Sequence, residues 1–101
     1  MPEFGNPFSV LKAGKKLTKE ELIRGVRMMI AAEYEAVQMY MQIAEATDDE
    51  LTKRVMTDVA NEEKVHAGEF LGLLKHLAPD EEEFYQEGAQ EVEEEIAKLK
   101  R

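Results

Sequence analysis

Two long stretches of helical apolar periodicity, separated by a short polar link, constrain the fold of this chain more than any other feature. Apolar residues recur at helical spacing over 22–44 and again over 51–77. This spacing puts them on one face of a helix, so helices are expected over about 19–46 and onward from the link to about residue 77. The link 47–50 is expected to form a tight turn and a helix cap, and Pro79 ends the second helix. The pattern predicts an antiparallel helical hairpin.

The segments on either side of the hairpin have a different character. Residues 1–17 contain prolines and glycines with little periodicity, which predicts an irregular N-terminal arm. The hairpin segment, 18–78, opens at Thr18, which forms a capping box with the glutamate three positions later. Residues 79–101 form an acidic segment that is expected to be a short C-terminal helix, interrupted near Gly88.

Length and composition narrow the classes of protein that this chain can represent. A helical chain of 101 residues leaves much apolar surface uncovered, so this all-α hairpin is expected to self-associate, and two hairpins together would make a four-helix bundle. A net charge of −9 disfavours binding to nucleic acid or to anionic membranes. The chain has no cysteine, which excludes iron–sulfur clusters and thiolate sites, so any metal would be held by oxygen and imidazole ligands. Because no leader or membrane-spanning segment is evident, a soluble, cytoplasmic protein is expected.

Three polar residues interrupt the apolar stripes where a hydrophobic residue is expected. Glu33 breaks the stripe of the first helix, and Glu63 and His66, spaced i and i+3, break that of the second. In an antiparallel hairpin, Glu33 and Glu63 each lie roughly 22 Å from the turn along the helix axes, so they should meet at the same height. Inward carboxylates at one height need a cation or a shared proton, because burying them unpaired is costly.

A metal ion is the simplest cation for this place. Glu on one helix and Glu-x-x-His on its neighbour make half of the ligand set of a di-iron or di-manganese carboxylate bundle. A second copy related by a two-fold axis would complete a centre with four carboxylates and two imidazoles. The alternative without metal is a solvated helix face or a buried hydrogen-bonded network, since a single Glu-x-x-His is a weak signal by itself.

Some residues near these positions could have either of two roles. Tyr40 is either a core aromatic or a participant in electron or hydrogen-bond chemistry at the centre. Glu35 and Glu62 lie off the stripes, where they face solvent or pass cations inward. His76 lies near the C-terminal end of the second helix, where the helix dipole favours a cationic side chain, and it is given no ligand role. The acidic run 80–95 is expected to be a solvated helix face.

The segments Glu33-Tyr34-Glu35-Ala36-Val37-Gln38-Met39-Tyr40 and Glu62-Glu63-Lys64-Val65-His66-Ala67-Gly68-Glu69 resemble those of the encapsulated ferritins, short ferritin-like proteins held inside encapsulin nanocompartments. The resemblance implies that Glu33, Glu63 and His66 bind iron across a dimer interface, with Tyr40 beside the centre. It also implies that Glu35 lies on the route by which iron reaches the centre, and that dimers assemble into a decameric ring. Ala32 and Met39 depart from the family, whose members often carry an acid and a tryptophan at those positions.

The function expected from these residues and this resemblance is that of a ferroxidase. Fe(II) would bind at a di-iron site shared by two subunits and lose electrons to oxygen, and the Fe(III) would be stored in an encapsulin compartment, with the encapsulin shell protein as a partner. A rubrerythrin-like peroxidase is an alternative enzyme, although such enzymes usually need an electron-delivery module and this chain has no cysteine for a rubredoxin-type centre. A metal-free helical assembly module is the alternative from another class.

Overall fold

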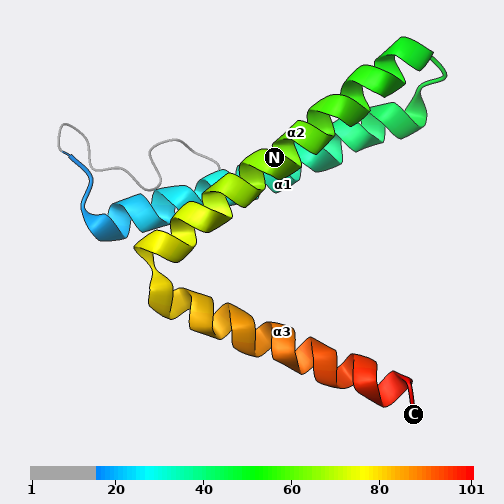
Figure 1. The fold of residues 1–101 in the computed structure, drawn as a ribbon. Helices are drawn as coiled ribbons and strands as arrows, with labels where there is room; N and C mark the ends of the chain where they lie inside the picture. The colour runs from blue at the N-terminus through cyan, green and yellow to red at the C-terminus, as the bar shows by residue number, and fades with distance from the viewer. Residues whose placement is uncertain (1–15) are drawn as a thin grey trace.

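The computed structural model describes residues 16–101 and contains three helices in this part of the chain (Figure 1). They are α1 (Lys19–Ala46), α2 (Glu50–Leu77) and α3 (Pro79–Leu99). α1 and α2 lie side by side and antiparallel, joined by a short turn, whereas α3 points away from the hairpin. The all-α fold and the hairpin expected from the sequence are therefore confirmed. Most of the N-terminal arm expected over 1–17 lies outside the described residues.

Local side-chain hydrogen bonds explain where the two long helices begin. The Thr18 backbone N–H donates to Glu21 Oε1 at 2.9 Å, and the Glu21 N–H donates to Thr18 Oγ1 at 3.2 Å, which is a complete capping box. At the start of α2, Asp49 accepts a hydrogen bond from the Thr52 N–H at 2.9 Å. α2 ends before Pro79, which opens α3 at its first position, where its missing N–H costs no intrahelical hydrogen bond.

The core of the hairpin lies at its open end, far from the turn. Val26, Ile30 and Leu74 are buried against one another there. The partly buried residues that pack around them are Ile23, Phe70, Leu77 and Ala78. Closer to the turn, the buried positions are alanines, Ala44 and Ala60, whose small side chains let two helices approach closely. One hairpin therefore builds only a narrow core.

Many large apolar side chains remain exposed along the hairpin, and no residue of α3 is buried. Those at least 45 % exposed on α1 and α2 are Met29, Tyr34, Met39, Ile43, Leu51, Val55 and Val65. This much uncovered apolar surface is unusual for a stable monomer and typical of a chain that associates. The dimeric bundle expected from the sequence agrees with this surface.

The third helix differs from expectation in one respect, because it is not interrupted at Gly88. α3 runs without a break from Pro79 to Leu99, a helix of 21 residues that fills most of the segment 79–101. A single glycine inside a helix costs only about 1 kcal/mol relative to alanine, and its glutamate, glutamine and alanine neighbours are strong helix formers. A Cβ added at Gly88 would meet nothing within 4 Å, so no close packing requires a glycine or a break there.

Candidate metal centre

The hairpin brings together the three side chains that interrupt the apolar stripes. Glu33 comes from the middle of α1, and Glu63 and His66 come from the facing turn of α2. One ligand atom from each residue lies within 4.8 Å of the others. The two helices therefore present these groups at the same height, as the equal distances from the turn predict.

The separations between these atoms suit a shared cation better than direct hydrogen bonds. His66 Nδ1 lies 3.5 Å from Glu63 Oε2 and 3.9 Å from Glu33 Oε2. Both distances exceed the usual N–H···O range of about 2.7–3.2 Å. Ligand atoms that each lie about 2.0–2.2 Å from one metal ion are separated by about 3–4 Å, depending on the angle at the metal. The two separations from His66 Nδ1 thus fall in the range expected of ligands that share one metal ion.

The Glu33 carboxylate gives the clearest indication that a cation would stabilise these three residues. Its Oε2 atom is buried and accepts no hydrogen bond in the described part of the chain. The side chains of Glu33 and Glu63 are only 18 % and 19 % exposed, whereas that of His66 is 49 % exposed. A buried carboxylate oxygen without a hydrogen bond costs about 1–3 kcal/mol, so a bound cation would relieve a real penalty. The residues present therefore fit an oxygen- and nitrogen-ligated metal such as iron or manganese.

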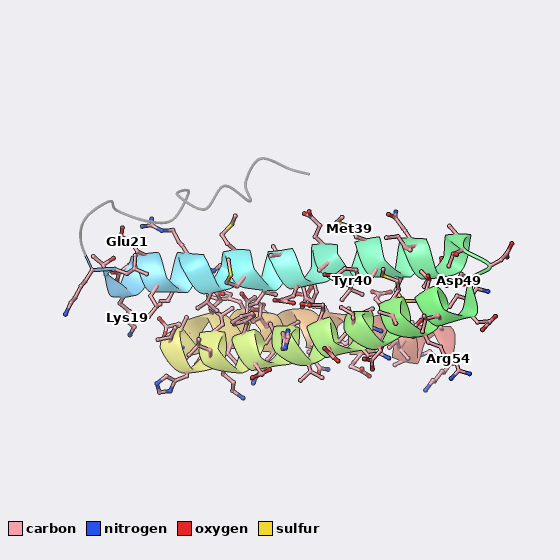
Figure 2. The ribbon with its side chains drawn as sticks, turned by 90° about the horizontal axis from the view of Figure 1, so that it is seen from above. Lys19, Glu21, Met39, Tyr40, Asp49 and Arg54 are labelled. Carbon is pink, nitrogen blue, oxygen red and sulfur yellow. The ribbon has the colours of Figure 1, made fainter. Side chains whose placement is uncertain are left out.

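The other predicted site residues lie outside this three-residue group. Tyr40 is half-buried on the side of α1 that faces α2, while Met39 points away from the hairpin (Figure 2). Glu35 is half-buried and Glu62 is exposed. His76 lies in the last turn of α2, where the helix dipole favours a cation, and it is not part of the three-residue group. The roles predicted for Tyr40, Glu35 and Glu62 remain predictions.

A second polar cluster, which the sequence did not reveal, fixes the start of α3. The Arg27 side chain on α1 donates from Nε to both carboxylate oxygens of Glu81, at 3.1 and 3.2 Å, and also forms an ion pair with Glu81 through Nη2. Tyr85 OH donates to the same carboxylate. The hydrogen bonds from Arg27, followed by that from Tyr85, hold the pKa of Glu81 below its usual value, and the bond to Glu81 raises the pKa of Tyr85.

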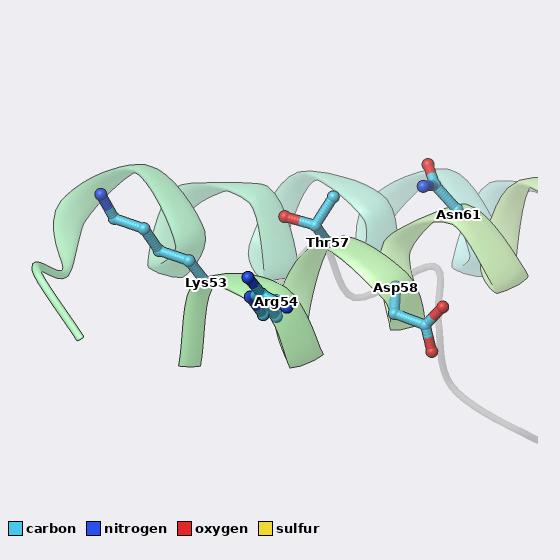
Figure 3. A pocket seen from close by; sticks show the side chains of 5 residues that line it. All are labelled: Lys53, Arg54, Thr57, Asp58 and Asn61. Carbon is cyan, nitrogen blue, oxygen red and sulfur yellow. The ribbon is translucent and has the colours of Figure 1, made fainter. Parts of the chain in front are cut away.

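Two surface depressions include residues of α2, and one of them includes two residues of the candidate metal centre. A shallow depression of about 250 Å³ is lined by Glu33, His66, Glu69 and Phe70. A wider one of about 480 Å³ lies along α2 nearer the turn and is lined by Lys53, Arg54, Thr57, Asp58 and Asn61 (Figure 3). The wider depression contains none of the three grouped residues, and its cationic and anionic side chains suit no single ligand. Of these two depressions, the smaller one opens onto the candidate metal centre.

No helix among residues 16–101 combines the length and the apolar character needed to cross a lipid bilayer.

This chain has relatives among known proteins. The rubrerythrin family profile matches residues 26–100. A ferritin-like–encapsulin shell fusion protein of Pyrococcus furiosus is 40 % identical over 89 residues, which are 88 % of this chain and 26 % of that protein. An encapsulin nanocompartment cargo protein of Myxococcus xanthus, EncC, is 38 % identical over 76 residues, which are 75 % of this chain and 58 % of EncC. The chain thus spans about a quarter of the first relative and somewhat over half of the second.

A solved structure also matches this chain over most of its length. The crystal structure of the encapsulated ferritin domain from Pyrococcus furiosus superposes with a TM-score of 0.80 at 40 % identity, and the match covers 88 % of this chain and 90 % of that one. Both the fold and the sequence are shared over nearly the whole length of the two chains. The chain therefore belongs to the rubrerythrin family of ferritin-like proteins and, within it, to the encapsulated ferritins.

Proposed function

We propose that this chain is a ferroxidase that oxidises Fe(II) to Fe(III) at a di-iron centre formed between two copies. The observation that carries the proposal is the grouping of Glu33, Glu63 and His66, with one Glu33 oxygen buried and without a hydrogen bond among the described residues. Encapsulated ferritin and encapsulin cargo relatives support an iron-handling role. In this role the protein holds two ferrous ions close together, and each ion gives one electron to dioxygen, so that two Fe(II), one O2 and two protons yield two Fe(III) and one hydrogen peroxide.

The residues of one chain supply only half of such a centre. Two carboxylates and one imidazole leave an ion with unfilled positions, and a two-fold axis through the site would double the set to four carboxylates and two imidazoles. The apolar side chains exposed along the same hairpin supply the surface that a second copy would cover. Metal and dimer formation are therefore coupled, because each favours the state in which the ligands from both copies meet.

Each residue of the group has a distinct part in this proposal. Glu33 and Glu63 neutralise the charge of the ions and, as hard oxygen ligands, favour the ferric product over the ferrous substrate. His66 adds a neutral nitrogen ligand and, being the most exposed of the three, lies where an ion first meets the group. Tyr40 lies on the side of α1 that faces α2. We propose that it lies beside the centre, as the resemblance to the encapsulated ferritins implies.

The location that we propose for this protein is inferred from its relatives, not from the residues of the site. The curated relatives are an encapsulin shell fusion and an encapsulin cargo protein. We extend this to the present chain and propose that it works inside an encapsulin compartment in the cytoplasm, as a homodimer or a decameric ring of dimers. Two hairpins enclose no mineral cavity, so Fe(III) would be stored in the space that the shell encloses.

Aerobic addition of Fe(II) to the purified chain tests the proposed activity. The expected result is a rise in ferric absorbance faster than the autoxidation of Fe(II) in buffer, lost in Glu63→Ala and kept in Glu87→Ala, a matched change of an exposed glutamate on α3. If wild-type chain gives no acceleration, the three residues form a hydrogen-bonded network of an assembly module. If peroxide and an electron donor accelerate turnover and oxygen does not, the chain is a peroxidase.

A further inference from the structure

A third surface depression lies on the side of the hairpin that faces away from His66. It has a volume of about 320 Å³, lies where α3 leaves the hairpin, and is lined mostly by apolar side chains, of which Tyr34 and Leu71 are exposed. On α2, Leu71 follows His66 by five positions, so the two side chains leave the helix about 140° apart. The depression shares no residue with the one beside the candidate metal centre. A second copy bound at His66 therefore leaves this side of the hairpin open.

A row of lysines on α2 extends this apolar depression toward the turn. Lys53, Lys64 and Lys75 are spaced by 11 residues, so they lie within about 40° of one another around the helix axis and span about 33 Å along it. Leu71 lies on the same row, and the acidic residues of α2 between Lys53 and Lys75 lie on other sides of the helix. None of the three lysines forms an ion pair within residues 16–101. The row is therefore a positively charged strip on a chain whose net charge is −9.

The third helix carries a surface of matching character. Val92, Ile96 and Leu99 recur at helical spacing and are exposed, and they continue a row that Tyr85 begins. Every charged residue over 80–95 is acidic. α3 has 21 residues, a length of about 31 Å, which is close to the length of the lysine row. α3 thus combines an apolar row with flanking carboxylates, where the hairpin combines an apolar depression with lysines.

The α3 of the same chain leaves this surface of the hairpin uncovered. Within the described residues, its hydrogen bonds to the hairpin are made by Glu81, which accepts from Arg27 on α1. Beyond this first turn α3 points away from the hairpin, and none of its residues is buried (Figure 1). The contact through Glu81 therefore fixes the place where α3 departs, and the apolar row of α3 stays exposed.

We infer that the depression and the lysine row of one hairpin bind α3 of another copy, which makes this side of the hairpin a second interface between copies. The occupant is a second copy because its α3 matches the surface in length, in charge and in its apolar row, and every copy brings one such helix. Burial of the apolar rows favours binding, and the contacts between lysines and carboxylates select this helix over a neutral one. The interface joins metal-bound dimers into larger assemblies and does not require that the chain oxidises iron.

The electrostatic part of this interface follows from Coulomb's law. A lysine replaced by glutamate at about 5 Å from a carboxylate turns an attraction into a repulsion, which lowers the association constant about fivefold for each contact at physiological ionic strength. A charge placed in the apolar row is buried without a partner, so a loss of at least about tenfold is expected. Added salt should dissociate these assemblies, because the Debye length falls from about 8 Å at physiological ionic strength to about 3 Å in 1 M salt.

Sedimentation velocity of the full chain with Mn(II), at several protein concentrations and two salt concentrations, tests this interface. Lys64→Glu and Val92→Asp each change one of the two surfaces. The controls are Lys19→Glu, with the same change of charge at the start of α1, and Ala97→Asp, about 140° around α3 from Val92. We expect Lys64→Glu to weaken association beyond the dimer about fivefold and Val92→Asp at least about tenfold, with both controls close to wild type. Helix content by circular dichroism and the Mn(II) stoichiometry should equal those of wild type in all four variants.

Three outcomes would overturn the inference. If Lys64→Glu and Val92→Asp assemble like their controls, α3 of another copy does not bind this surface. If the wild-type chain stays a dimer at every protein and salt concentration, the surface is no interface between copies. If both variants lose Mn(II) together with assembly, the surface belongs to the metal-bound dimer itself. Failure of the proposed function looks different, because a chain that does not accelerate Fe(II) oxidation can still assemble through this interface.

Discussion

Replacement of Glu33 by leucine should stabilise the metal-free protein while it destroys the metal centre. Leucine has a similar size, is a strong helix former and fits the apolar stripe that Glu33 interrupts. The Glu33 side chain is only 18 % exposed, and its Oε2 is buried without a hydrogen bond. The variant therefore removes an unsatisfied buried group from a position at which the fold otherwise favours a hydrophobic residue.

The expected gain can be worked from these contacts. Loss of one unsatisfied buried oxygen relieves about 1–3 kcal/mol. The attraction lost between Glu33 and His66 is small, because the two atoms are 3.9 Å apart and the imidazole is 49 % exposed. A net gain of about 1–3 kcal/mol raises the melting temperature by roughly 4–8 °C per kcal/mol for a domain of this size.

Thermal unfolding in chelator, measured beside Mn(II) calorimetry, decides this prediction. Glu33→Leu should melt several degrees above wild type without metal and should bind no Mn(II) at the site. Glu45→Leu is the matched control on an exposed part of α1, and it should change stability by less than about 0.5 kcal/mol. A clear loss of stability in Glu33→Leu would refute the reasoning, because it would show that Glu33 serves a structural hydrogen-bond network.

Further predictions concern the ligands, the core, the start of α3 and assembly. Glu63→Ala and His66→Ala should abolish rapid Fe(II) oxidation while circular dichroism shows intact helices. Wild-type oxidation rates in either would exclude that residue from the centre. Leu74→Ala should lower the free energy of unfolding by about 2–5 kcal/mol in urea titrations, since Leu74 is 3 % exposed, and a smaller loss would mean that the core collapses around the gap. Arg27→Gln should cost less than about 1 kcal/mol near neutral pH, because the ion pair with Glu81 is partly solvated. The lowered pKa of Glu81 means that this contribution is present above its ordinary value of 4.5 and is lost as the pH falls through the lowered value, so a cost that persists in stronger acid would contradict the assignment. Divalent metal should shift the mass distribution toward larger assemblies and chelator should reverse the shift, whereas a distribution indifferent to both would indicate a preassembled oligomer.

The helix boundaries could be predicted because their signals are local. Thr18 and Glu21 lie within one turn of each other, and their capping hydrogen bonds need no tertiary contact to form. Pro79 ends α2 for steric reasons that hold in any fold. The interruption predicted near Gly88 was wrong. A glycine in a helical pattern can either end the helix or stay inside it at a small energetic cost, and the neighbouring residues decide which of the two occurs.

The candidate centre was predictable for a similar reason. An antiparallel hairpin has one geometric variable along its axis, the distance from the turn, so Glu33 and Glu63 could be matched by counting residues. The Arg27–Glu81 pair could not be found this way, because the two residues are 54 positions apart and meet only through the direction that α3 takes after Ala78.

The most direct test of the shared di-iron centre is anomalous diffraction at the iron edge from crystals of the iron-loaded chain. The account predicts two iron peaks close to a two-fold axis between two copies, each within coordination distance of Glu33, Glu63 and His66 side chains drawn from both chains. The number of iron ions per chain measured in solution should then be one. Iron held by the three residues of a single unpaired chain, or no peak near them, would contradict the account.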